Sequence, residues 1–523
     1  MEVMLRVRTG ADTAAVAGNT EKTLLAALTA GGFTQVEAPC GGRGRCGKCL
    51  VTVTGPVRSL ADGTVRQALE ERLLACRFAP AGACAVTIPE KAAMTVVTSG
   101  AGDIGPAGET GLGLAVDIGT TTVAVLLYDM ADGRLLAGMG ERNAQRLYGA
   151  DVVSRITACA SGGLVPMRDG IREQITALAR ELCCRAGRDP SELRRTVIAG
   201  NTVMEHLFDG LDPTGIGTAP FTPESLFGDE RDGGLCLPGL GADGPALLCP
   251  CVSGYVGGDI TAGLLACGAD RAEELWLYAD IGTNGEMALV GPEGIVTCAT
   301  AAGPAFEGAE IACGMDGSPG AVDRVRLEDG EIRAHVIGGG PALGLCGSGL
   351  IDAVAALLEA GVIDETGRMA EAEELPPVHG DRIFLLEDGT RAFRLEGEVY
   401  LAARDVRQVQ LAKAAIRAGA ETLLSRAGKT PGDIRRLLIA GGFGSFMDKN
   451  SALRIGLLPP VDPERIEHVG NAAGAGAALA LTPAGRDRLA ALAARCGYLE
   501  LSSARDFMDR YIDCMLFDEE DGI

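Results

Sequence analysis

One pattern occurs twice in this chain: an apolar strand that ends in an acidic residue, a Gly-Thr turn, and a second apolar strand. The first copy runs from Leu114 to Leu126 and the second from Leu277 to Leu289. The turn glycines, Gly119 and Gly282, allow backbone N–H groups to approach phosphate oxygens because no Cβ stands in the way. One copy alone is weak evidence, since an Asp-Gly pair between strands is often an ordinary hairpin. Two copies predict a pair of phosphate-binding β-hairpins that together clamp a nucleotide.

Side chains in and beside the two turns suit this role. Asp117 and Asp280 end the first strand of each copy and can hold a hydrated Mg²⁺ against the phosphates. Glu286, on the second strand of the second copy, either helps to place Mg²⁺ or water or pairs structurally across the hairpin. These three acids are the candidate catalytic residues. The turn residues predicted to bind phosphate are Gly119, Thr120, Thr121, Thr122, Gly282, Thr283 and Asn284.

Two later strands repeat as well. Val197–Asn201 and Leu438–Gly442 are both apolar and run into glycine. Each half of this region therefore has a hairpin, a third strand, helices and a later strand that joins the same sheet. We expect two α/β lobes, at residues 111–275 and 276–523, with a cleft between them. Asp259, at the start of an apolar helix, either reaches the metal ion or caps the helix N-terminus.

Composition argues against several classes of partner. Forty-seven Lys and Arg against 70 Asp and Glu give a net charge of −23, which repels nucleic-acid backbones. Aromatic residues, on which single-stranded nucleic acids stack, make up only 4% of the chain. No apolar run reaches the roughly 18 residues that span a bilayer, and the N-terminal residues are typical of a strand rather than a signal peptide. We therefore predict a cytoplasmic protein that binds neither nucleic acid nor a membrane.

Four of the 17 cysteines have the spacing of an iron–sulfur ligand set. Cys40, Cys46 and Cys49 share a glycine-rich loop, and Cys76 follows at a distance. Three clustered thiolates and one distant thiolate bind 2Fe-2S clusters, whereas structural zinc sites usually pair two close-set couples. The layout resembles plant-type and adrenodoxin-type ferredoxins, and its first gap of five residues is of the adrenodoxin kind. The other cysteines are expected to be reduced thiols.

Residues 1–90 are accordingly expected to form a small β-grasp domain. Leu5–Arg8 alternates like a strand, Thr20–Ala30 predicts a helix that a glycine pair ends, and another short helix is expected before Cys76. Residues 91–110 are small and lack periodicity, which predicts a flexible linker with a span of roughly 20–25 Å. Such a linker would let the N-terminal domain move between an electron donor and an acceptor.

The duplicated region resembles the ATPase superfamily of actin, hexokinase and heat-shock chaperones, which has the ASKHA or ribonuclease-H-like fold. The resemblance implies ATP as the nucleotide, an adenosine segment at Ala440–Ser445, and two connecting helices at Val256–Gly263 and Asn471–Ala477 whose small residues cross closely at a hinge. The residues implied to bind adenosine are Gly441, Gly442, Phe443 and Gly444. The fold class is therefore predicted to be α+β multidomain, with a β-grasp 2Fe-2S ferredoxin domain followed by a two-lobed α/β ATPase.

Nearly the full length also resembles one family, the reductive activators of corrinoid-dependent enzymes. The cysteine loop and four further segments carry this resemblance, at residues 143–156, 302–311, 344–350 and 511–517. It implies an ATP-hydrolysing protein that takes one low-potential electron on a 2Fe-2S cluster and returns a Co(II) corrinoid to the methyl-accepting Co(I) state. The implied partners are an external low-potential electron donor and a corrinoid protein, the cobalamin-binding component of a methyltransferase system. Many relatives carry a further domain, sometimes linked to dimerisation, between the ferredoxin domain and the first phosphate turn. Only the short linker occupies that place here, so a homodimer stays open.

Other functions stay open on the sequence alone. One is an ATP-driven electron injector for a different low-potential enzyme, and another is a ferredoxin-type carrier with a regulatory nucleotide-binding domain. A small-molecule kinase ranks last, because such an enzyme has no use for a tethered cluster. Glu307, in the loop Ala302–Ile311, is a candidate for sensing phosphate or contacting the partner.

Overall fold

The structure is a computed structural model, and it describes residues 2–10, 12–33, 36, 49–88, 102–241, 244–442 and 444–518. The chain divides into two compact units. One unit comprises Met1–Ala93 and Arg142–Ile171, and the other comprises Met94–Glu141 and Arg172–Ile523. Below, the second is called the two-lobed unit.

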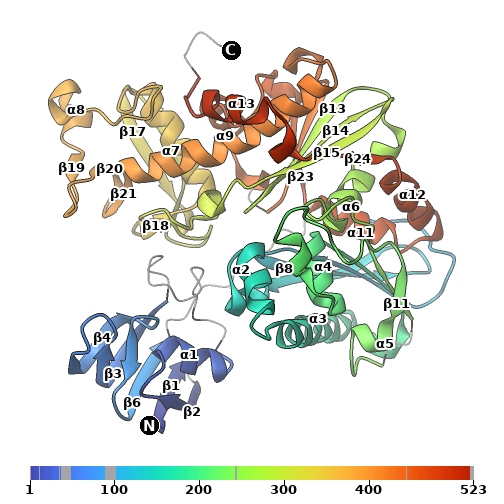
Figure 1. Cartoon of the computed structure of the whole chain (residues 1–523), viewed down its shortest axis with the longest axis horizontal. Coiled ribbons are helices and arrows are strands. Elements are labelled where there is room, and N and C mark those ends of the chain that lie inside the picture. The colour runs from blue at the N-terminus through green and yellow to red at the C-terminus, as the bar shows by residue number, and fades with distance from the viewer. Residues whose placement is uncertain are drawn as a thin grey trace. The chain divides into compact units, whose positions relative to one another are not determined.

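A six-stranded sheet with one short helix forms the N-terminal part. Its elements are β1 (Glu2–Thr9), β2 (Asp12–Asn19), α1 (Leu24–Ala30), β3 (Leu50–Ser59), β4 (Val65–Leu74), β5 (Phe78–Pro80) and β6 (Cys84–Ile88). The strand order is β2-β1-β6-β3-β4, β5 pairs with β3, and β1 runs parallel to β6 (Figure 1). Alternate residues of the strands, such as Leu5 and Val7, are buried in the core. The predicted strand at Leu5–Arg8 is confirmed.

Helix α1 begins later than the sequence predicts. It starts at Leu24 rather than Thr20, because strand β2 continues to Asn19. The hydroxyl of Thr23 then accepts the backbone N–H of Ala26 at 3.0 Å, which caps the first turn of the helix.

The short helix expected before Cys76 is wrong. That segment is strand β4, which pairs antiparallel with β3 along most of its length. Its Leu and Glu residues are good helix formers, but intrinsic propensity is worth little per residue, and the pairing with a neighbouring strand outweighs it. Ala68 and Leu73 of β4 are buried against the same core as β1.

The rest of this unit is helical. It contains η1 (Ala144–Tyr148), α2 (Val152–Cys159) and the start of α3 (Leu164–Ala186). Arg155 of α2 is fully buried, and its guanidinium donates to the carbonyl of Gly149 at 3.1 Å and to Oε1 of Gln145 at 3.5 Å. These bonds give the buried charge the partners that it needs away from water.

The two-lobed unit contains two sheets of matching topology. The first sheet consists of β7 (Leu112–Ile118), β8 (Thr122–Asp129), β9 (Leu135–Arg142), β10 (Leu193–Gly200), β11 (Glu230–Asp232) and β12 (Pro245–Leu248). The second consists of β13 (Trp276–Ile281), β14 (Gly285–Gly291), β15 (Gly294–Thr300), β22 (Arg436–Ala440), β23 (Ile466–Gly470) and β24 (Cys496–Tyr498). In each sheet the first strand pairs antiparallel with the next one and parallel with a much later one, β7 with β8 and β10, and β13 with β14 and β22. The predicted duplication is therefore confirmed.

Two helices connect the lobes and cross closely. Helix α6 (Gly258–Ala266) packs against α11 (Ala472–Leu479), and a Cβ on Gly476 would lie only 1.8 Å from the carbonyl oxygen of Ala262 (Figure 1). A side chain at this position would therefore push the helices apart. The close crossing predicted from the small residues is confirmed.

Gly476→Ala is expected to lower the free energy of unfolding by about 1–3 kcal/mol, the usual cost of overpacking a tight contact. Gly170→Ala in α3 is the matched control, because a Cβ there meets nothing within 4 Å and should stabilise the helix by about 0.4–1 kcal/mol. Urea unfolding followed by circular dichroism measures both changes. Equal stability of the two variants would show that the crossing tolerates a methyl group.

Further elements complete the lobes. Helix α9 (Ala403–Arg426) packs on β14 and β15 of the second sheet, and α7 (Gly347–Glu359) packs on β16 (Ala321–Glu328) of a separate small sheet, all within one large core. The first lobe also contains α4 (Thr202–Asp209), and the second contains η5 (Pro304–Glu307) and β18 (Gly344–Leu345). In the part of the chain that the structure describes, no helix is both long and apolar enough to cross a membrane.

Residues 102–110, at the end of the predicted linker, lie against the first lobe. The N–H of Ile104 donates to the carbonyl of Gly133 at 2.9 Å, and that of Ala107 donates to the carbonyl of Met130 at 3.0 Å. Ala107 is buried in the core of this lobe. These bonds hold the end of the linker beside β8, while the domain boundaries themselves stay predictions.

Candidate functional site

The three predicted catalytic acids lie on the strands beside the two hairpin turns. Asp117 lies near the end of β7, and Asp280 lies near the end of β13. Glu286 is the cross-strand partner of Asp280 in the β13–β14 hairpin, so the two carboxylates are neighbours on the same face. Two negative charges directly opposite each other destabilise a hairpin, so this pair is a poor structural contact. The geometry therefore favours a site that binds a cation.

The pKa values of these three acids are all raised, which agrees with burial and mutual repulsion. Burial, and then the charge of Asp280, raise the pKa of Asp117 to about 7, although a hydrogen bond from Asn471 acts in the opposite direction. Burial raises the pKa of Asp280 to about 6. Burial and the neighbouring charges of Asp259 and Asp280 raise the pKa of Glu286 well above its ordinary value. A divalent cation would relieve this repulsion.

Asp259 belongs to the same group of acids. The N-cap residue of α6 is Gly257, so Asp259 does not occupy the cap position, although it lies in the first turn of the helix. The Asp259 carboxylate accepts the N–H of Ile260 at 2.8 Å, and burial followed by the charges of Asp280 and Asp117 raises its pKa. Asp259 is therefore a functional candidate that sequence reasoning left undecided.

The acids do not form a ready-made metal cage. Among the described residues, no group of three or more His, Cys, Asp or Glu is arranged to hold a metal ion. Mg²⁺ usually keeps several waters and binds through one or two carboxylates together with substrate phosphates. The donor set thus fits Mg²⁺ that arrives with a nucleotide, and Asp117 and Asp280 are the residues that would hold it.

Glu205 was missed by the sequence analysis. It lies in α4 and is fully buried, and its Oε1 has no hydrogen-bond partner among the residues that the structure describes. A Cβ on Gly258 would lie 2.2 Å from this oxygen, which places Glu205 at the start of α6. Burial and the charge of Asp259 raise its pKa well above the ordinary value. A glutamate inside an apolar helix was the signal that could have found it.

Polar side chains join the two turns. The hydroxyl of Thr121 donates to Oε2 of Glu307 at 2.8 Å, and the hydroxyl of Thr283 donates to Oε1 of the same residue at 2.7 Å. Asn201 donates to the hydroxyl of Thr120 at 3.0 Å. The turn of the first lobe and the turn of the second are therefore linked through one carboxylate, and the predicted clamp residues lie together.

The remaining predicted nucleotide residues occupy the same region. Gly441 has a φ of 90°, and a Cβ on it would lie 2.7 Å from Oδ1 of Asp280, so the segment after β22 adjoins the second turn. A Cβ on Gly119 would lie 2.8 Å from the carbonyl of Thr122, and one on Gly282 would meet nothing closer than 3.8 Å. The backbone N–H of Gly282 donates to the carbonyl of Asn284 at 2.9 Å, which closes the second turn.

The end of the adenosine segment is partly described. A Cβ on Gly442 would meet nothing within 4 Å, whereas one on Gly444 would lie 2.6 Å from Cγ2 of Ile439. Glycine at position 444 thus permits a close approach to β22. Phe443 lies outside the described residues.

Two of the four predicted cluster ligands are described. Cys49 and Cys76 are both buried, and the N–H of Ala75 donates to the carbonyl of Cys49 at 2.8 Å, which brings the two cysteine segments together. Cys40 and Cys46 lie outside the described residues. Cys84 is buried in β6, and burial raises the pKa of its thiol to about 11, which suits packing rather than metal binding. The described part fits a cluster ligated by Cys49 and Cys76.

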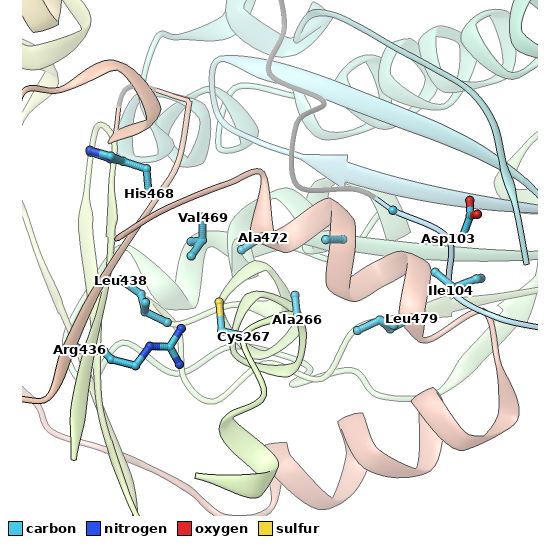
Figure 2. A pocket seen from close by; sticks show the side chains of 12 residues that line it. Asp103, Ile104, Ala266, Cys267, Arg436, Leu438, His468, Val469, Ala472 and Leu479 are labelled. Carbon is cyan, nitrogen blue, oxygen red and sulfur yellow. The ribbon is translucent and has the colours of Figure 1, made fainter. Parts of the chain in front are cut away.

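A cavity of about 520 Å³ lies beside the crossing of α6 and α11 (Figure 2). Residues of both lobes line it, and Ile104 from the end of the predicted linker joins them. Figure 2 shows Arg436 and His468 toward one end and Asp103 toward the other. None of the predicted site residues is among the described residues that line this cavity, which is therefore separate from the two turns.

Comparison with known proteins agrees with this organisation. Residues 9–81 match the 2Fe-2S iron-sulfur cluster binding domain, residues 112–272 match the RACo middle region, and residues 274–522 match the C-terminal domain of RACo, the ASKHA domain. A solved structure of a reductive activator for corrinoid, iron-sulfur protein is 31% identical, with a TM-score of 0.69 and coverage of 98% of each chain.

Two curated relatives have related names. The corrinoid activation enzyme RamQ of Eubacterium limosum is 37% identical over 386 residues, which cover 71% of this chain and 64% of the relative. The [Co(II) methylated amine-specific corrinoid protein] reductase of Methanosarcina barkeri is 26% identical, with 66% of each chain covered. The chain thus matches slightly less than two thirds of the length of these relatives.

Fold and site together define a class of protein, an ASKHA-type two-lobed domain joined to a 2Fe-2S ferredoxin domain. Within this class, the chain belongs to the RACo family, that of the reductive activator for corrinoid, iron-sulfur protein. The fold class and the family resemblance predicted from the sequence are confirmed.

The raised pKa of Asp117 predicts a specific pH dependence of stability. Between about pH 4 and 7 the folded protein keeps a proton that the unfolded chain has already lost, so stability falls as the pH rises through this window. Asp117→Asn stays neutral at every pH and should flatten the curve by roughly 2–4 kcal/mol, since each pKa unit corresponds to about 1.4 kcal/mol. Urea unfolding at pH 5 and pH 8 measures the difference. Parallel curves for variant and wild type would contradict it.

Proposed function

We propose that this chain is an ATP-dependent reductive activator of a corrinoid protein. An external low-potential donor supplies one electron to the 2Fe-2S cluster, and the electron passes to Co(II) of the partner to give Co(I) for methyl transfer. ATP and water become ADP and phosphate in the two-lobed unit. The observation that carries the proposal is the presence, in one chain, of two linked phosphate turns with facing acids and a 2Fe-2S domain.

Energetics supply the reason for ATP. Plant-type clusters have reduction potentials of about −400 mV, and the family resemblance implies a lower potential for the Co(II)/Co(I) couple of the proposed partner. Each 59 mV of this gap costs a factor of ten in a one-electron equilibrium. A change of conformation on ATP binding and hydrolysis can shift that equilibrium only if it alters how much more tightly the activator binds one cobalt state of the partner than the other.

In this proposal, separate sets of residues bind the metal ion, the phosphates and the adenosine. Asp117 and Asp280 hold Mg²⁺ on the phosphates, and Glu286 helps to place the metal ion or the attacking water. Backbone N–H groups and hydroxyls of the two turns bind phosphate, and the glycines after β22 let adenosine lie against backbone. The phosphate and adenosine residues are Gly119, Thr120, Thr121, Thr122, Gly282, Thr283, Asn284, Gly441, Gly442, Phe443 and Gly444.

The N-terminal domain carries the electron. Cys40, Cys46, Cys49 and Cys76 ligate the cluster, which supplies reversible one-electron chemistry when bound. We assign this domain to residues 1–90, the linker to 91–110, and the lobes to 111–275 and 276–523. A cytoplasmic location and a homodimeric assembly are further proposals, and sedimentation equilibrium checks the second.

The test mixes the reconstituted protein with a Co(II) corrinoid protein, a low-potential reductant and Mg-ATP under anaerobic conditions. Absorption spectra should show Co(I) forming only when all components are present. If the reduced protein instead reduces another low-potential enzyme and leaves the corrinoid as Co(II), the electron acceptor is wrong. If Co(I) forms equally well without ATP, the protein is an electron carrier with a regulatory domain.

A further inference from the structure

Glu307 occupies a place that the proposed function leaves unexplained. Its two carboxylate oxygens each accept a hydroxyl proton, Oε2 from Thr121 at 2.8 Å and Oε1 from Thr283 at 2.7 Å. Thr121 belongs to the first lobe and Thr283 to the second, although Thr121 and Glu307 are 186 positions apart in the sequence. One side chain thus bonds a threonine in each of the two phosphate turns.

A hydroxyl group has a single proton to donate. While the protons of Thr121 and Thr283 are donated to Glu307, they are not available to phosphate oxygens. The carboxylate and a phosphate group are both anions that accept from the same donors, and like charges at this distance repel. Glu307 and a bound phosphate therefore compete for one position.

The backbone of Glu307 is held firmly on both sides. Phe306, the preceding residue, is buried in the core of the second lobe, and Ala305 is buried with it. Gly308, the following residue, has a φ of 73°, and a Cβ there would lie 2.9 Å from the backbone nitrogen of Met315. A shift of the backbone would disturb these packed neighbours. Rotation of the Glu307 side chain is therefore the easier way to release the two hydroxyls.

We propose that Glu307 is a latch between the two phosphate turns that a phosphate group of the nucleotide displaces. This inference rests on the proposed function, since it requires that the turns bind phosphate. Without nucleotide, the Glu307 carboxylate accepts both hydroxyls and so joins the two lobes. With nucleotide, a phosphate group accepts the same hydroxyls and joins the lobes in its place. Nucleotide binding thereby replaces the Glu307 contact between the lobes by a phosphate contact.

The latch makes nucleotide binding weaker than the two turns alone would allow. Glu307→Gln removes the charge, and Glu307→Asp keeps the charge but is one methylene too short to reach both hydroxyls. Both variants are expected to bind ATP about tenfold more tightly than the wild type, the size of effect expected when competing charge-assisted hydrogen bonds are lost. Glu310→Gln is the matched control, because Glu310 is exposed in the same loop and its substitution changes the net charge equally.

Isothermal titration of the full chain with ATP, ADP and inorganic phosphate measures these affinities. A gain for ATP alone assigns the γ-phosphate as the displacing group, and an equal gain for ADP assigns the β-phosphate; either supports the latch. A gain with Gln but not with Asp would mean general charge repulsion and would overturn it, as would unchanged or weaker binding in both variants. If the variants bind inorganic phosphate more tightly but ATP no more tightly than the wild type, the ligand is free phosphate. That result would overturn the assignment of a nucleotide.

A second readout does not depend on affinity. Hydrogen exchange of the backbone amides in the two turns, without added ligand, should be faster in Glu307→Asp than in Glu310→Asp, because the shortened side chain at position 307 cannot reach both hydroxyls. Equal exchange would overturn the latch even if the affinity changed. If the wild type binds no nucleotide at all, the proposed function fails first, and the two failures are thus distinguishable.

Discussion

Replacing Cys76 by serine is expected to abolish Co(II) reduction while ATP turnover stays at the wild-type rate. Cys76 is buried beside the Cys49 segment, and a serine hydroxyl is a far weaker ligand for iron than a thiolate. ATP turnover should survive because the phosphate turns lie in the other compact unit. Electron paramagnetic resonance of the reduced cluster and absorption of the corrinoid measure the two effects.

Cys184→Ser is the control for this experiment. Cys184 is exposed in α3, and its loss should change neither the cluster signal nor the reduction. Cys46→Ser tests a second predicted ligand and should behave like Cys76→Ser. If either ligand variant still forms Co(I) at the normal rate, the four-cysteine assignment is wrong.

The second large effect is expected at the phosphate turns. Asp280→Asn should reduce ATP turnover by about 100-fold, the usual cost of losing one preorganised electrostatic group, and should leave the cluster spectrum unchanged. The Asp280 carboxylate faces Glu286 across the hairpin and adjoins Gly441, so it is central to the group of acids. An enzyme-coupled assay of ADP release measures the loss.

Glu293→Gln is the matched control for Asp280→Asn, because Glu293 is an exposed acid in the turn between β14 and β15. It should retain full turnover. Normal ATP hydrolysis by Asp280→Asn would remove this residue from the site. Equal losses in both variants would mean that net charge, rather than position, determines the rate.

The sequence was sufficient where the signal is local. The two hairpins follow from alternating apolar residues and turn glycines, all read within a few positions. The crossing of α6 and α11 was implied by the superfamily resemblance, and the small residues of both helices agree with it. Strand β4 was mistaken for a helix because its structure depends on pairing with β3, which local propensity does not contain.

The site was harder to predict because it joins distant parts of the chain. The role of Asp259 stayed undecided, since a sequence does not show whether an acid at a helix start faces its own backbone or other carboxylates. Glu205 was missed because the acid that it neighbours, Asp259, lies far away in the sequence. The link from Thr121 to Glu307 spans 186 positions, and only the folded lobes bring these side chains within 2.8 Å.

The most direct test of the whole account is the yield of Co(I) at a fixed electrode potential equal to the midpoint of the 2Fe-2S cluster. A mediated spectroelectrochemical cell holds the protein and a corrinoid partner at that potential, with Mg-ATP or Mg-ADP. The account predicts a low yield with ADP and a yield with ATP that is higher by at least one order of magnitude, since ATP must supply the missing 59 mV or more. The same yield with both nucleotides would show that ATP does not drive the electron to cobalt.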